Sequence, residues 1–279
     1  MDYFEKVLSN IRVKASIYYA GDICGTLDFR KDDKESHIHL IKEGVVKISE
    51  VDGKNVLIDK PSIIFLPRPY NHKLIVKDNT NATVICGTLK LGVNIQNPIT
   101  TSLPDLLIVE LSKIDGIENF IDLILRESIL KKNGTSAIQN RLCEILIIKL
   151  LGYCSEHKLS SGGTLAGFSE VRIARALHAI HSNPEKLWTV ESLAYEANLS
   201  RARFANLFHH VLGTTPLDYL TSWRMLLVQE LLCQGLSLEQ ISSKVGYSNA
   251  SALSRAFSKQ LGTSPIQWLK STTQDMQYD

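Results

Sequence analysis

The sequence predicts an α+β chain in which a small β-barrel or sandwich comes first, a helical hairpin follows, and an all-α domain comes last. Three observations support this order. Residues 13–96 contain short runs rich in β-branched residues between turn formers, and residues 117–154 carry apolar side chains at helical spacing. After residue 168, one helical pattern occurs twice.

Composition and length favour a soluble, cytoplasmic protein of two domains. The chain has 279 residues, of which 44% are hydrophobic and 22% charged, and its formal net charge of +2 identifies no partner. The start, MDYFEKVLSN, lacks the apolar core of a secretory signal, and the apolar runs are too short to span a bilayer. The five cysteines are irregularly spaced, which does not suggest a disulfide framework.

Changes in composition divide the chain into four segments. Residues 1–116 hold the expected strands, separated by turns such as Pro67-Arg68-Pro69. Residues 117–154 read as two helices, and the Ser/Gly-rich stretch 155–167, SEHKLSSGGTLAG, reads as a linker. The remaining residues, 168–279, are expected to form a separate helical domain.

The helical hairpin carries more apolar surface than two isolated helices can cover. It therefore needs the barrel, a second protomer or both as a partner, and we expect it to mediate a homodimer. The apolar side chains on which this expectation rests are Phe120, Ile124, Leu142, Ile145, Leu146 and Leu150.

The helical domain contains an internal repeat. LAYEANLSRARFANLFHHVLGTTPLDYL starts at Leu193, and ISSKVGYSNASALSRAFSKQLGTSPIQWL starts at Ile241. In each copy a short helix is followed by a Ser (Ser200 or Ser248) that is expected to cap a second helix, which stops at Leu-Gly. Any helical hairpin explains one copy. Two copies at one spacing favour paired helix-turn-helix motifs, whose second helices enter the major groove of DNA.

The placement of charge agrees with DNA binding. Residues 168–279 contain ten Lys/Arg and nine Asp/Glu, so the domain as a whole is nearly neutral. Residues 197–217 and 240–274 nevertheless contain no acidic residue, whereas each holds basic ones. A locally basic face is what contact with phosphates requires.

At this point the sequence resembles a known family. WTVESLA, LSRARF, LGTTP, LGTSP and YLTSWRM are similar to the tandem helix-turn-helix domain of AraC/XylS-type transcriptional regulators, in which one long helix, here residues 216–233, joins the two motifs. HLIKEG, FLPRPYNH, ICGTLKL and NPITTSLPDLL resemble the cupin-type N-terminal domain of one branch of that family. The resemblance covers most of residues 24–270. It implies an effector-sensing barrel, a dimerising element and a reader of double-stranded DNA, admits RNA polymerase as a further partner, and leaves the effector open.

The resemblance also assigns residues of the two reading helices. Asn can pair with adenine and Arg with guanine, whereas Ala can touch a thymine methyl group. Arg203 and Lys259 are expected to face phosphates or solvent, and His209 and His210 are expected to be solvated surface residues. The base-facing positions carried over from the family are Arg201, Ala202, Ala205, Asn206, Asn249, Ala250, Ser251 and Arg255.

Cupin-type barrels often hold a metal on histidines from two strands, and this chain offers His37, His39 and His72. His37 and His39 share one face of a strand because side chains alternate. Two interpretations follow. In one, His37, His39, Glu43 and His72 bind iron or manganese for oxygenase or isomerase chemistry. In the other, the barrel senses an effector without catalysis, and the DNA-reading half favours this second interpretation.

The stretch ICGTL occurs at residues 23–27 and again at 85–89. Each copy predicts a strand with its Cys and Thr on one face, and two similar strands would explain the repeat without any function. The sharper hypothesis is a zinc site made by two cysteines and two histidines, in which His37 could replace Cys24. Its four ligands would be Cys24, His39, His72 and Cys86.

Overall fold

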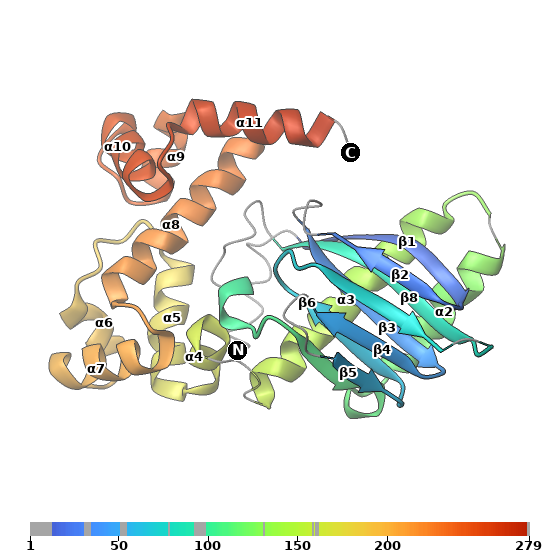
Figure 1. Cartoon of the computed structure of the whole chain (residues 1–279). Helices are drawn as coiled ribbons and strands as arrows, with labels where there is room; N and C mark the ends of the chain where they lie inside the picture. Colours follow the sequence, from blue (N-terminus) through green and yellow to red (C-terminus); the bar gives the residue numbers. More distant parts are fainter. Residues whose placement is uncertain are drawn as a thin grey trace. The chain divides into compact units, whose positions relative to one another are not determined.

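The computed structural model describes residues 13–30, 35–50, 55–77, 79–91, 99–130, 132–157, 159 and 162–277. These residues form two compact units (Figure 1). The sheet unit comprises the described residues of 13–91 and 103–159, and the helical unit comprises those of 99–102 and 162–277. Residues 99–102 thus cluster with the helical unit, although they lie inside the predicted sensing domain.

The sheet unit consists of two antiparallel sheets. One sheet has five strands in the order β1-β8-β3-β6-β9, and the other has four strands in the order β2-β7-β4-β5. The strands are β1 (Val13–Ile23), β2 (Thr26–Phe29), β3 (Ser36–Glu43), β4 (Val46–Glu50), β5 (Asn55–Ile58), β6 (Ser62–Leu66), β7 (His72–Val76), β8 (Ala82–Leu91) and β9 (Leu107–Glu110).

One hydrophobic core joins the two sheets. Ile41, Ile64 and Val84 of the larger sheet and Ile48 and Leu74 of the smaller sheet are fully buried in the same cluster. Alternation along each strand sends these side chains to the inner face. The predicted β-rich N-terminal half is thereby confirmed, and its described strands pair as two facing sheets and not as one closed ladder.

Two helices pack against β1. They are α2 (Ile117–Leu130) and α3 (Thr135–Glu156), which follow the short 3-10 helix η3 (Leu111–Lys113). The backbone N–H of Ile17 donates to Oδ1 of Asn140 at 2.9 Å, which ties α3 to the edge strand. The sheet therefore covers much of the apolar surface that the sequence shows in this hairpin.

This packing corrects the predicted dimer face. Ile124, Leu142, Leu146 and Leu150 are buried within the chain itself, and of the six predicted apolar residues only Ile145 is exposed. The helical period identified two apolar helices, but it could not show which side meets β1. The apolar side chains that α3 leaves exposed are Ile138, Ile145 and Ile148, with exposed fractions of 42%, 40% and 38%.

The two ICGTL stretches differ in structure. The second copy lies within β8, as predicted, and Gly87 faces a bulge in β1, where an added Cβ would lie 2.9 Å from the carbonyl oxygen of Ser16. The prediction of a strand is wrong for the first copy. There Ile23 ends β1, Gly25 has a φ of +77°, and Thr26 begins β2, so Cys24 lies in the connection between two strands.

The helical unit contains the two predicted helix-turn-helix motifs, α6–α7 and α9–α10, joined by α8. In the described part of the chain, no helix has both the length and the apolar character needed to cross a membrane. The elements are η2 (Thr100–Ser102), α4 (Gly163–Ser169), α5 (Val171–Ser182), α6 (Val190–Glu196), α7 (Arg201–Leu212), α8 (Pro216–Cys233), α9 (Leu238–Lys244), α10 (Ala250–Leu261) and α11 (Pro265–Gln277).

Local signals in the sequence set most of these helix ends. Gly213 and Gly262 end α7 and α10 in the left-handed conformation, with φ of 72° at both. Helix α8 begins at Pro216 after the cap Thr215, at the predicted residue. The predicted cap Ser248 is corrected, because Asn249 caps α10 by accepting a hydrogen bond at Oδ1 from the Ala252 N–H at 2.8 Å.

Part of the predicted linker is helical. Residues 163–167 lie in α4, and their glycines allow close packing. A Cβ added to Gly163 would lie 2.6 Å from Cβ of Ser102, and one added to Gly167 would lie 2.6 Å from Cδ1 of Leu177. The Ser/Gly-rich composition that suggests flexibility thus serves tight contacts here.

A buried polar group joins α4, α5 and α8. The Nε2 atom of His181 lies 2.9 Å from the hydroxyl of Tyr219, which also accepts a hydrogen bond from Thr164 at 3.4 Å. The imidazole packs on Trp223 with the ring centroids 4.1 Å apart. Burial, assisted by the neighbouring His178, lowers the pKa of His181 from 6.5 to about 3.

This shift predicts acid destabilisation of the helical unit. Between pH 6.5 and 3 the unfolded chain binds a proton at His181 that the folded chain does not, so stability present above pH 6.5 is lost as the pH falls. The slope is about 1.4 kcal/mol per pH unit in that window. Urea unfolding at several pH values, followed by tryptophan fluorescence, measures it, because Trp188, Trp223 and Trp268 all lie in this unit.

His181→Gln should weaken this pH dependence, and His210→Gln, which changes an exposed histidine, should leave it unchanged. An equal pH slope in the wild-type chain and in His181→Gln would contradict the assignment.

Candidate DNA interface and histidine cluster

The second helix of each motif, α7 or α10, has one buried side and one exposed side. In α7 the buried side chains include Phe204 and Phe208, and in α10 they are Leu253 and Phe257. The ten residues predicted to face DNA lie on the outer sides, where Ala205 and Ala250 are half-buried. The exposed ones are Arg201, Ala202, Arg203, Asn206, Asn249, Ser251, Arg255 and Lys259.

Two of these residues already have partners within the chain. Nε of Arg201 lies 2.8 Å from Oε1 of Glu191, which neutralises this guanidinium in part. Asn249 uses its Oδ1 to cap α10, so its amide can recognise a base only while keeping that bond. Arg255 is exposed one turn into α10.

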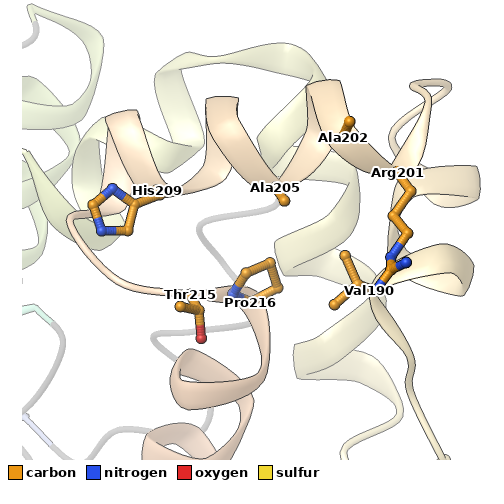
Figure 2. A pocket seen from close by; sticks show the side chains of 7 residues that line it. All are labelled: Val190, Arg201, Ala202, Ala205, His209, Thr215 and Pro216. Atoms are coloured by element: carbon orange, nitrogen blue, oxygen red, sulfur yellow. The ribbon is translucent and has the colours of Figure 1, made fainter.

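A groove runs along α7. It has a volume of about 410 Å³ and lies between α7 and the first residues of α6 and α8 (Figure 2). In Figure 2, Ala205 points from α7 towards Pro216 and Val190, and Arg201 and His209 stand near opposite ends of the helix. Its lining residues are Val190, Arg201, Ala202, Ala205, His209, Thr215 and Pro216.

Arg224 of α8 holds the two motifs together. Its guanidinium donates to the carbonyl oxygens of Pro184 at 2.8 Å and Lys186 at 3.0 Å, in the loop before α6. On the other side it lies 5.6 Å from the ring centroid of Tyr247, which follows α9. Gly246 makes this approach possible, because an added Cβ would lie 2.5 Å from both the guanidinium and the carbonyl oxygen of Glu185.

The sheet unit brings three histidines together. His37 and His39 come from β3 and His72 from β7, and one ligand nitrogen of each lies within 4.8 Å of the others. All three are at most 2% exposed. The Nε2 atoms of His39 and His72 are 2.7 Å apart, and Nδ1 of His72 lies 2.8 Å from the carbonyl oxygen of Tyr70. The N–H at Nδ1 donates that bond, so Nε2 of His72 directs a lone pair towards His39.

The cluster keeps its imidazoles neutral. Burial lowers the pKa of His72 to about 4, although its bond to the Tyr70 carbonyl opposes the shift. Burial, reinforced by the neighbouring His72 and His37, lowers the pKa of His39 well below its ordinary value. Among the described residues, Nδ1 of His39 is a buried atom without a hydrogen-bond partner. Neutral imidazole is the form that binds metals, so these residues fit a transition-metal ion.

The two predicted cysteine ligands, Cys24 and Cys86, differ from the histidines in their positions and from each other in burial. Cys86 pairs with His39 across the β3–β8 ladder and therefore shares the inner face of the sheet, where burial raises the pKa of its thiol to about 12. It is not part of the three-histidine group, and neither is Cys24, which is exposed at the β1–β2 connection. Glu43, the carboxylate of the enzyme interpretation, is exposed and also lies outside the group.

Phe29 is a neighbour of the cluster that the sequence did not reveal. It pairs with His72 in the β2–β7 ladder, and its ring stacks on His72 with the centroids 4.8 Å apart. It also lies 4.7 Å from the ring of His39. Only the strand register, which joins residues 43 positions apart, brings Phe29 to this place.

Comparison with known proteins agrees with both halves of the fold. Residues 2–156 match the Cupin family, and residues 193–271 match a helix-turn-helix domain. The RCS-specific transcriptional activator RclR of Escherichia coli is 27% identical over 232 residues, which is 81% of each chain. The regulator AlkR of Acinetobacter baylyi is 26% identical over 300 residues, covering 95% of this chain and 98% of AlkR. Fatty-acid-bound ToxT from Vibrio cholerae has 16% identity and a TM-score of 0.40, covering 93% of this chain and 94% of ToxT.

A cupin-type sheet unit and two helix-turn-helix motifs on one chain define a transcriptional regulator that binds DNA. The chain belongs to the AraC/XylS-type transcriptional regulators with a cupin-type N-terminal domain.

Proposed function

We propose that this regulator recognises a specific duplex sequence by placing α7 and α10 in successive major grooves, and that an effector or metal in its sheet unit sets its activity. The observation that carries the proposal is the pair of repeated motifs, each with one buried and one exposed side, on a single connecting helix. Successive major grooves on one face of DNA are about 34 Å apart. RclR is named an activator, which supports RNA polymerase as a further partner.

Alanine substitutions of Arg255 and Lys259 test whether each residue contacts a base or a phosphate. Arg255→Ala should weaken binding to the preferred site by about 1–3 kcal/mol and relax one base position, because a guanidinium pairs with the edge of guanine. Lys259→Ala should weaken binding to all sequences similarly and reduce its salt dependence. Binding isotherms on a preferred duplex and on an unrelated duplex, at two salt concentrations, measure both.

Arg175→Ala, which removes an exposed charge from α5, is the matched control and should change neither property. Unchanged affinity and unchanged base preference in both test variants would show that α10 is not a reading helix.

We further propose that the three-histidine cluster holds zinc. His37, His39 and His72 would supply three ligands, and Cys86 shares their side of the sheet as the fourth ligand predicted from sequence. Three histidines also suit iron, so metal identity separates this proposal from the enzyme alternative. The relatives are named transcriptional regulators, and Glu43 lies outside the cluster, which together favour a chain without catalytic activity.

Elemental analysis of full-length protein, purified without a metal-affinity tag, should find about one zinc per chain, and chelation should lower its melting temperature. His72→Gln should lose the metal, and Cys86→Ser should bind it less tightly. Cys24→Ser should retain it, because Cys24 is exposed and outside the cluster. Iron or manganese in place of zinc would support the enzyme alternative, and a metal-free protein of unchanged melting temperature would refute the site.

We also propose that the chain is a homodimer through the exposed isoleucines of α3. Ile138, Ile145 and Ile148 lie at spacings of seven and three residues, so they share one face of the helix.

Ile145→Glu/Ile148→Glu should convert a dimer to a monomer, because two carboxylates would be buried in the interface. Sedimentation at micromolar concentration measures the mass. Ile129→Glu, at an 80% exposed position on α2, is the control, and a wild-type chain that sediments as a monomer would contradict the proposal.

A further inference from the structure

The two reading helices offer different chemistry to DNA. The residues that line the groove along α7 include the aliphatic Val190, Ala202, Ala205 and Pro216. In Figure 2, Ala205 faces Val190 and Pro216. Arg201, at one end of the helix, is held by Glu191 at 2.8 Å. The exposed Arg203 and Asn206 of α7 are not among the residues that line this groove. The predicted DNA-facing residues of α10 are mainly polar, and its exposed ones are Asn249, Ser251, Arg255 and Lys259.

The aliphatic lining restricts what the groove beside α7 can recognise. An alanine methyl group donates and accepts no hydrogen bond, so Ala202 and Ala205 cannot distinguish adenine, guanine or cytosine by pairing. In the major groove, the apolar group that a base edge presents is the C5-methyl group of thymine. The groove is accessible from outside, since Ala202 and His209 at its walls are exposed. Its aliphatic walls therefore match that methyl group.

We propose that the first helix-turn-helix reads thymine methyl groups through Ala202, Ala205 and the groove beside them, whereas the second reads polar base edges through Arg255. This inference rests on the proposed DNA-binding function. It specifies which bases must occur in each half of the DNA site, the half under α7 and the half under α10. The half-site under α7 contains thymines at the contacted positions, and its recognition depends on their methyl groups.

The experiment uses the full-length chain and two steps. Duplexes selected from a random pool by wild-type protein and by Arg255→Ala first define the preferred site. The half in which one base position loses its preference in Arg255→Ala lies under α10, so the other half lies under α7. Each thymine of the site is then replaced singly by deoxyuridine, which lacks only the methyl group. At one or two thymines under α7 the affinity should fall about fourfold, the effect of leaving one methyl group unburied.

Matched alanine variants assign the effect to residues. Ala205→Ser should remove most of the deoxyuridine effect under α7, whereas Ala250→Ser, the same change on α10, should leave it intact. Replacing the critical thymine pair by cytosine paired with guanine should weaken binding, and 5-methylcytosine at that position should restore part of the affinity.

The possible outcomes separate the two proposals. If no sequence is enriched from the pool, the proposed DNA-binding function itself fails. If a site is enriched but its α7 half contains no thymine sensitive to deoxyuridine, the function stands and the methyl-group inference is overturned. An effect that Ala205→Ser leaves unchanged also overturns the inference.

Discussion

The contact of Arg224 with the loop before α6 and with Tyr247 is the constraint on which DNA reading depends. Two recognition helices bind one duplex at a lower entropic cost when their separation is fixed before binding. Helix α8 has 18 residues, a length of about 27 Å, which is of the same order as one turn of DNA. Helix α8 shares a hydrophobic core with the second motif, in which Val228 packs with Ile241 and Phe257. Arg224 adds a link to the first motif, because one guanidinium contacts the flanking segments of both motifs.

The histidine cluster places a comparable constraint on the sheet unit. Buried imidazoles lose their hydration, and an unpartnered nitrogen such as Nδ1 of His39 costs free energy that the fold must offset elsewhere. Apolar side chains at these positions would fill the core without that penalty. Polar groups retained at such a cost are typical of binding sites. Phe29 adds to this argument, because its ring covers two of the three histidines and limits access of water to them.

The sequence predicted features that local chemistry determines and missed those set by distant residues. Pro216 and the glycines after α7 and α10 fix helix ends within a few residues. The bounds of α8, residues 216–233, were predicted from the family resemblance and agree with the structure. Alternation placed His37 and His39 on one face. The positions of Phe29 and the exposed face of α3 depend on strand register and on contact with β1, which no local pattern contains. Cys24 was misplaced because an identical pentapeptide can be a strand or a turn.

Because the helical unit is nearly neutral, its affinity for DNA depends strongly on the arrangement of its two reading helices. Residues 168–279 hold ten Lys/Arg against nine Asp/Glu, so the long-range attraction of the whole domain to DNA is weak. Confining the acids to segments outside 197–217 and 240–274 keeps the reading faces basic without making the whole domain cationic. Such a protein gains affinity mainly when both helices engage at once, because binding of one helix raises the effective concentration of the other. The attraction to DNA of any sequence is weak, whereas the free energies of the specific contacts add. The protein therefore discriminates between sequences and does not bind every duplex tightly.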